Sequence, residues 1–329
     1  MKRDRGFDFV RASAILMVLA GHLRHLVVPN YEGGLLKGIP YFFTSFGHFG
    51  VIIFFGLSGV LIHKRMNSIV TLKDFISFIS IRLFRIYCVL VPALIFTVLI
   101  DLSADSLELY EGIEKYAIIS QESNPSLRLN LSTLLINLFS FQTFFGPYLG
   151  SNGSLWSLSY EVWFYIAGGL FYYKRFLILA TIPLVLVQPI WGLYLVFWLV
   201  VPYLIRFGHK SLVLFIISTL ILGLIHYCRP LYIDVIYMLY FIVNFEYVIK
   251  FQGNRLTSYF AKISYSLYVF HYPILLFLVF LLFPGRIKSL AFIDICVILT
   301  ILFVTIEVLY RLFEGNNFIL KIYNKLRVK

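Results

Sequence analysis

Arg11 and His22 stand at the two ends of an apolar stretch, RASAILMVLAGH, that contains no other ionisable side chain. Eleven helical positions at about 100° each return to nearly the same face, so both side chains lie on one stripe about 16 Å apart. An imidazole can take a proton from a hydroxyl near neutral pH, and a guanidinium can hold an anion. His22 is therefore a candidate catalytic base, with Arg11 on the same stripe. The alternative is a structural histidine bonded to a neighbouring helix.

Glu161 lies in a second apolar stretch, SLWSLSYEVWFY, about 10 Å from the outer end of its predicted span. The same depth is expected for His22, so this carboxylate is predicted to orient the imidazole or to stabilise its cation. The neighbouring Ser159 and Tyr160 are predicted to donate hydrogen bonds to an oxyanion. The structural alternative is a carboxylate that only bonds nearby Ser and Tyr side chains.

Arg82 and Arg85 are three residues apart on one helix face, at the expected inner edge of the membrane. Such a pair can clamp a phosphate, although ordinary basic residues at the cytoplasmic edge give the same pattern. The sequence contains neither a P-loop nor a G-x-G-x-x-G motif. Any phosphate-bearing cofactor is therefore expected to be held by side chains at this inner rim.

Tyr268 and His271 lie in the stretch ISYSLYVFHYP, three residues apart on one predicted helix face. Pro273 is expected to kink this span and to free backbone carbonyls for a cavity. We predict that Tyr268 and His271 contact the substrate. Packing of aromatic side chains between helices is the alternative for the tyrosines.

The elements that position these residues must be membrane spans. Of the 329 residues, 60% are hydrophobic and 13% charged, with a mean hydropathy of +0.88, whereas soluble domains are about 45–50% apolar and 25% charged. The composition predicts an all-α, polytopic helical bundle forming one domain over 1–329. The net charge of +12 is attributed to cytoplasmic loops and anionic lipid, not to nucleic acid. Three isolated cysteines indicate neither a disulfide framework nor a metal site.

Ten apolar runs are expected to cross the membrane. They are 8–28, 41–62, 83–103, 154–173, 176–190, 192–205, 211–228, 231–249, 263–283 and 289–310. An eleventh run, 131–146, is short and polar, and is expected to pack as an amphipathic or re-entrant piece. With ten spans and both termini cytoplasmic, 21 of the 28 Lys and Arg residues lie inside, and the acidic loop 104–153 lies outside.

Five ordered motifs resemble the acyltransferase-3 family of membrane acyltransferases. They are Arg11 and His22 separated by ten residues, FFGLSGVLIHKR (54–65), IRLFRIY (81–87), SLWSLSYEVWFY (154–165) and ISYSLYVFHYP (263–273). The second motif usually reads Ser-Gly-Phe, whereas this chain has Val60 after Ser58 and Gly59. The motifs cover the chain almost end to end. With them we assign Ser58, Gly59 and Arg65 to the cofactor-binding site.

The resemblance implies an acyl donor, usually acetyl-CoA, presented from the cytoplasm, and a hydroxyl acceptor on a surface glycan or lipid-linked precursor. His22 would be the catalytic base and Arg11 its essential partner. Many relatives carry an extracytoplasmic esterase-like domain. Because this chain ends 19 residues after its last predicted span, we expect no such domain here. We expect an undecaprenyl-linked or other membrane-delivered saccharide as acceptor, in the bacterial cytoplasmic membrane.

Two other classes of function remain open. A proton-coupled transporter or flippase of a glycan lipid would use His22 and Glu161 as a proton relay. It predicts internal repeats or paired broken helices, which the sequence does not show, and activity without CoA. A non-catalytic membrane scaffold would leave the buried His and Glu without a purpose.

Overall fold

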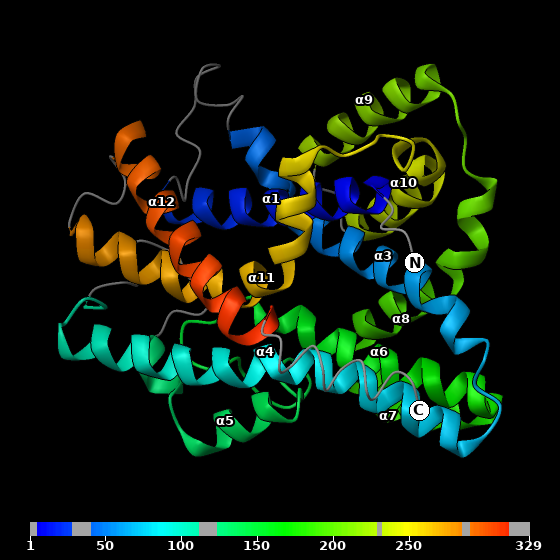
Figure 1. Ribbon diagram of the computed structural model, residues 1–329, viewed down its shortest axis with the longest axis horizontal. Coiled ribbons are helices and arrows are strands. Elements are labelled where there is room, and N and C mark those ends of the chain that lie inside the picture. The colour runs from blue at the N-terminus through cyan, green and yellow to red at the C-terminus, as the bar shows by residue number, and fades with distance from the viewer. Residues whose placement is uncertain (1–4, 28–40, 112–123, 229–231, 285–289, 316–329) are drawn as a thin grey trace.

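The protein is described by a computed structural model over residues 5–27, 41–111, 124–228, 232–284 and 290–315 (Figure 1). Within these ranges the chain is helical and forms no β-strand, which confirms the all-α prediction. The α-helices are α1 (Arg5–Val27), α3 (Gly47–Met66), α4 (Leu72–Ser106), α5 (Leu131–Leu138), α6 (Leu155–Tyr173), α7 (Ile182–Val187), α8 (Pro189–Leu204), α9 (Leu212–Cys228), α10 (Ile233–Val248), α11 (Arg255–Leu282) and α12 (Phe292–Leu309).

Within the described ranges, six helical segments are long and apolar enough to cross a membrane, as fits a multi-pass membrane protein. They are Arg5–Leu26, Tyr41–Met66, Leu72–Ser106, Pro189–Phe207, Arg255–Leu282 and Phe292–Glu314. Each of the ten predicted runs overlaps a helix, but several of these helices are shorter than the roughly 20 residues of a span. The count of about ten spans therefore stays a prediction. So does the cytoplasmic placement of the termini, which lie outside the described residues.

The run 131–146 contains one short helix and a tight turn. The eight residues of α5 rise only about 12 Å, far less than a bilayer core of about 30 Å. The indole Nε1 of Trp163 donates to the Ser140 carbonyl at 2.9 Å, and Gln142 Nε2 donates to the Leu155 carbonyl at 2.9 Å. The irregular backbone is thus bonded to protein, as non-helical backbone at membrane depth must be.

Helix α1 lies at the centre of the bundle, packed between α3 and α11 (Figure 1). Glycines allow this packing, because a Cβ on Gly50 would lie 2.6 Å from the Ala14 carbonyl oxygen, and one on Gly21 would lie 3.0 Å from the Gly47 Cα. The α1 and α3 backbones are therefore nearly in contact. This close packing holds α1, which carries Arg11 and His22, in place against α3.

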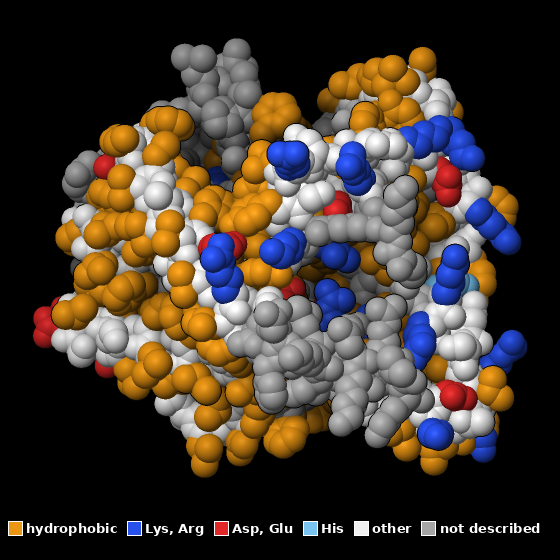
Figure 2. Space-filling view, in the orientation of Figure 1, with side chains coloured by type: hydrophobic (Ala, Val, Ile, Leu, Met, Phe, Trp, Pro, Cys, Tyr) orange, Lys and Arg blue, Asp and Glu red, His pale blue; other side chains and the backbone are white. Residues whose placement is uncertain are grey.

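Charge is distributed unequally between the two ends of the bundle. Lys and Arg side chains gather over the centre and over the half where α3 ends and α4 begins, and acidic side chains lie at the far tip of α4 (Figure 2). The last turn of α3 is basic, whereas Asp101 and Asp105 lie at the end of α4. The two ends of α4 therefore lie in electrostatically different surroundings.

Candidate functional site

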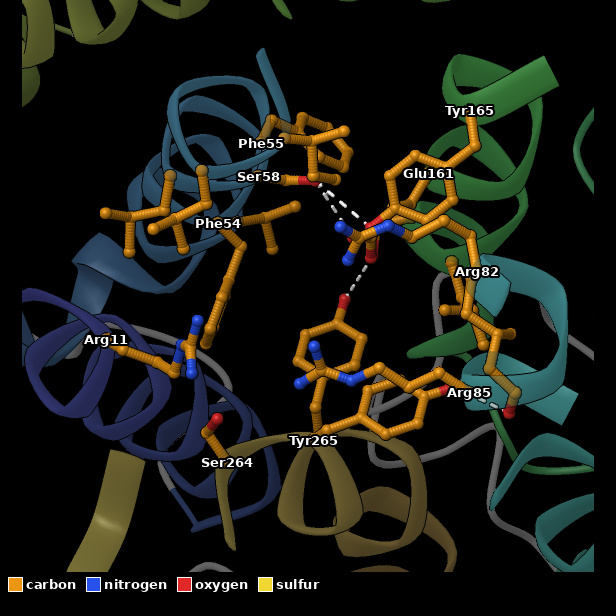
Figure 3. A pocket seen from close by; sticks show the side chains of 18 residues that line it. Arg11, Phe54, Phe55, Ser58, Arg82, Arg85, Glu161, Tyr165, Ser264 and Tyr265 are labelled. Atoms are coloured by element: carbon orange, nitrogen blue, oxygen red, sulfur yellow. Dashed lines mark hydrogen bonds between the residues drawn. The ribbon is translucent and has the colours of Figure 1, made fainter. Parts of the chain in front are cut away.

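A cavity of about 150 Å³ lies between α1, α3, α4, α6 and α11. Arg11 reaches it from α1, Arg82 and Arg85 from α4, and Glu161 from α6 (Figure 3). With Ser58 from α3 and Tyr268 from α11, the structure thus brings together six of the predicted site residues, from five helices. Three guanidinium groups and one carboxylate line the cavity, and two further carboxylates, Asp8 and Glu314, act on Arg11 from nearby. Guanidinium groups gathered in this way can bind an anionic ligand.

The carboxylate of Glu161 is held by hydroxyl groups. Ser58 Oγ donates to Glu161 Oε1 at 3.1 Å, and the Tyr165 hydroxyl donates to the same oxygen. The Arg82 guanidinium points toward this group in Figure 3, with its carbon 6.0 Å from the centre of the Tyr165 ring. Ser58 lies one helical turn from Phe54 and Phe55, which also line the cavity, so α3 supplies both a polar and an apolar part of the wall.

Glu314 is a second carboxylate near the arginines, which the sequence analysis did not single out. It lies at the end of a π-helical turn, Tyr310–Glu314, that follows α12. Its Oε2 accepts from the Ser266 hydroxyl at 2.6 Å and from the Ser266 amide at 3.2 Å, and it lies within electrostatic range of Arg85 and Arg11. A π-helical turn is often found at functional sites, but no sequence signal announces one.

His22 lies apart from this cavity. It is on α1 with Arg11, about 16 Å further along the axis, as the spacing predicts. Its ring packs against two side chains of α11, with centroid distances of 5.0 Å to His271 and 4.8 Å to Tyr272. The expected direct pairing with Glu161 is not found among the described residues, because Glu161 is bonded to Ser58 and Tyr165.

Tyr268 connects the cavity to the histidines. It lines the cavity together with Ser157, and the two hydroxyl oxygens are 2.5 Å apart. The Tyr268 ring also lies 6.1 Å from the His271 ring, centroid to centroid. The cavity therefore has arginines near one end. Tyr268 forms its wall near the other end, and His271 and His22 lie behind this side chain.

Four further predicted site residues do not line the cavity. Ser159 bonds to the Trp156 carbonyl and to Thr143, and Tyr160 packs among aromatic rings on the opposite face of α6. Gly59 faces α8, where a Cβ would lie 2.5 Å from the Trp198 carbonyl oxygen. Arg65 is exposed at the end of α3.

The described part of the chain contains no cluster of three or more His, Cys, Asp or Glu side chains that could hold a metal ion. The polar groups in and around the cavity are instead arginines, hydroxyls, the carboxylates of Glu161 and Glu314, and two imidazoles. Such a set can bind an anion at one end and accept a proton at the other.

Comparison with known proteins gives two matches and one negative result. A family model described as an acyltransferase domain, that of the acyltransferase-3 family, matches residues 4–249. An O-acetyl transferase of Shigella phage Sf6 is 33% identical over 175 residues, which are 51% of this chain and 46% of that relative. The alignment thus spans less than half of the relative's length. No solved structure matches significantly.

Proposed function

This chain belongs to the acyltransferase-3 family. We propose that it transfers a small acyl group, acetyl, from acyl-CoA to a hydroxyl of a saccharide. Acetyl is small enough to fit a narrow cavity, and the similar phage protein is named as an O-acetyl transferase. We further propose a surface glycan or undecaprenyl-linked saccharide as acceptor. The whole of 1–329 would act as one domain in the bacterial cytoplasmic membrane.

The convergence of Arg11, Arg82 and Arg85 on one cavity is the observation that supports an acyl-CoA donor. Guanidinium groups bind phosphate through paired, charge-assisted hydrogen bonds, and CoA carries several phosphates. The cavity volume of about 150 Å³ is below the roughly 300–1,000 Å³ of sites that enclose a drug-sized ligand. It therefore suits the narrow pantetheine arm, with the nucleotide at the rim formed by α4.

The distance between Arg11 and His22 along α1 then matches the separation between the bound end of the donor and its reacting thioester. An arm that enters beside Arg11 and passes Tyr268 carries the thioester toward His22, about 16 Å away. The acceptor hydroxyl would reach His22 from the opposite end of the bundle. One helix would thus fix the separation between donor binding and proton transfer.

The proposed reaction is a direct acyl transfer. His22 takes the proton of the acceptor hydroxyl while its oxygen attacks the thioester carbonyl carbon. The C–O bond forms, the C–S bond breaks, and the CoA thiolate leaves with the proton from the His22 imidazolium. The products are the O-acyl ester and CoA.

The test is the O-acyl content of the host's surface glycan, measured by NMR. A strain lacking the protein is restored with wild type, His22→Ala or His25→Ala, at matched membrane levels. His25 is the matched control because it is an exposed histidine on the same helix. We expect wild type and His25→Ala to restore acylation and His22→Ala to lower it more than about 100-fold. Equal acylation in all strains would overturn the proposal.

A further inference from the structure

His271 is the buried group of the site whose second nitrogen has no partner in the described structure. Its side chain is fully buried, and Nδ1 lies 2.8 Å from the Tyr268 carbonyl oxygen and 3.0 Å from the Leu267 carbonyl oxygen. Carbonyl oxygens only accept, so Nδ1 carries the proton. In the neutral ring Nε2 then presents a lone pair, and it makes no hydrogen bond within the described ranges.

The turn of α11 that carries His271 is held in place from outside the helix. Pro273 has no amide hydrogen, so the Val269 carbonyl lacks its usual donor four residues on. Asn152 Nδ2 donates to this carbonyl at 3.0 Å and also lies 3.1 Å from Thr97 Oγ1. Its Oδ1 accepts from the Ser154 hydroxyl at 2.7 Å. A buried side-chain amide thus replaces the lost helical bond and fixes the position of the His271 ring.

His22 is the titratable ring beside this lone pair. The two ring centroids are 5.0 Å apart and the planes are inclined by 53°. The two rings are not hydrogen-bonded in the structure, but this centroid separation is short enough for a rotation of the His22 ring to bring one of its nitrogens within the roughly 2.7–3.2 Å of a hydrogen bond to His271 Nε2. His22 makes no hydrogen bond of its own among the described residues, so one of its nitrogens is available to His271 and the other to a substrate.

We infer that His271 is the positioning residue of His22: when the His22 ring turns toward it, His271 Nε2 accepts the His22 N–H, and the other His22 nitrogen is left unprotonated toward the acceptor hydroxyl. This inference rests on the proposed function for the role of His22. It assigns to His271 the orienting task that the sequence suggested for Glu161. A fixed acceptor selects one tautomer of its partner, as the groups behind metal-binding histidines do.

The first experiment observes the pair without any reaction. The full chain, labelled with ¹⁵N-histidine and held in nanodiscs, has seven histidines whose tautomers are read from ¹⁵N chemical shifts. We expect an Nδ1–H tautomer for His271, and an Nε2 resonance that moves on His22→Phe but not on the control His63→Phe. An Nε2 resonance unchanged by His22→Phe would overturn the inference. The chemical shifts do not depend on which molecule is the acyl donor. The experiment can therefore contradict the His22–His271 inference without contradicting the proposed function, and the reverse.

The second experiment measures CoA release from acetyl-CoA in membranes that contain the acceptor. His271→Phe keeps a ring without the Nε2 acceptor, whereas His271→Gln keeps an acceptor oxygen near the same place. We expect His271→Phe to lower kcat about 10- to 100-fold with KM for acetyl-CoA unchanged, and His271→Gln to recover most of the rate.

A double-mutant cycle separates positioning from a general effect on folding. In the His22→Ala background, His271→Phe should lower the residual rate no further, because the group it positions is absent. A further loss equal to that seen in the wild-type background would show an independent role and overturn the inference. An unchanged kcat in the single His271→Phe variant would do the same.

Discussion

Arg82 and Arg85 lie apart from His22, which separates the residues proposed to bind the donor from the residue proposed to transfer the proton. Both line the cavity with Arg11, whereas His22 lies against α11 outside it. A residue that binds the donor and a residue that moves the proton should therefore have separable kinetic effects. Loss of a donor-binding arginine should weaken binding in both the ground state and the transition state.

Replacing Arg82 by Gln tests this division. One charge-assisted bond to a phosphate contributes roughly 1.5–3 kcal/mol, so KM for acetyl-CoA should rise about 10- to 100-fold with little change in kcat. Arg206→Gln is the control, because Arg206 is an exposed arginine outside the cavity. Measuring CoA release against acetyl-CoA concentration gives both constants. An unchanged KM in Arg82→Gln would remove this arginine from the donor site.

Glu161 offers a test between two roles for one carboxylate. Gln keeps an oxygen that accepts from Ser58 and Tyr165 but removes the negative charge from a site for an anion. We expect Glu161→Gln to lower KM for acetyl-CoA several-fold, because less repulsion acts on the phosphates, and to keep kcat within about threefold. Should kcat instead fall about 100-fold at constant KM, the carboxylate would act on His22 as first predicted from the sequence.

At the scale of elements, the positions of the helices could be predicted from the sequence, but the direction in which each helix points its polar side chains was harder to predict. Each apolar run overlaps a helix because a lipid-facing backbone must satisfy its own hydrogen bonds. The pairing of Glu161 with His22 rested on equal depth, which fixes a position along the membrane normal but not the direction around each helix. Ser157, Glu161 and Tyr165 are four residues apart and face the cavity from one side of α6. Ser159 lies between them in sequence and therefore points to another side of the helix.

The partners of buried polar groups come from distant segments and left no local sequence signal. Asn152, in a loop before α6, bonds to a carbonyl of α11 that Pro273 frees. The proline predicted a free carbonyl, but not which side chain would reach it. Asp101 likewise accepts from Tyr110 and from the Ser151 amide, which ties the end of α4 to the same loop. Tertiary packing alone brings these groups together.

Gly59 tests the contact between α3 and α8. A Cβ there would lie 2.5 Å from the Trp198 carbonyl oxygen, so Gly59→Ala must push two helices apart. Overpacking costs roughly 1–3 kcal/mol, against a gain of up to about 1 kcal/mol in helix propensity. Gly223→Ala on α9 is the matched control, since its nearest atom would be Phe42 Cζ at 3.5 Å. Thermal unfolding in detergent should show a lower Tm for Gly59→Ala only, and equal Tm values would contradict this packing argument.

At the scale of the whole molecule, α4 defines the direction in which the bundle crosses the membrane. Its 35 residues span about 52 Å, more than the roughly 30 Å of a bilayer core. Ser68, just before α4, and Ser106, at its end, are both exposed. Both should therefore be accessible to water, on opposite sides. Because the last turn of α3 is basic, the positive-inside rule predicts that Ser68 faces the cytoplasm.

Cysteine labelling tests this orientation. Ser68→Cys and Ser106→Cys are made separately in a chain whose own Cys88, Cys228 and Cys296 are replaced by Ser. In intact spheroplasts, a membrane-impermeant maleimide should label Ser106→Cys alone, and Ser68→Cys should react only after permeabilisation. The cysteine-free chain should stay unlabelled.

The outcome bears directly on the proposed reaction, which requires acyl-CoA to reach the cavity from the cytoplasm. Arg82 and Arg85 lie about three turns into α4 from its Ser68 end, so the donor can reach them only if that end faces the cytoplasm. Labelling of Ser68→Cys from outside would place the arginines on the wrong side for this donor. The cavity would then need another anionic ligand, whereas the pairing of His22 with His271 would be unaffected.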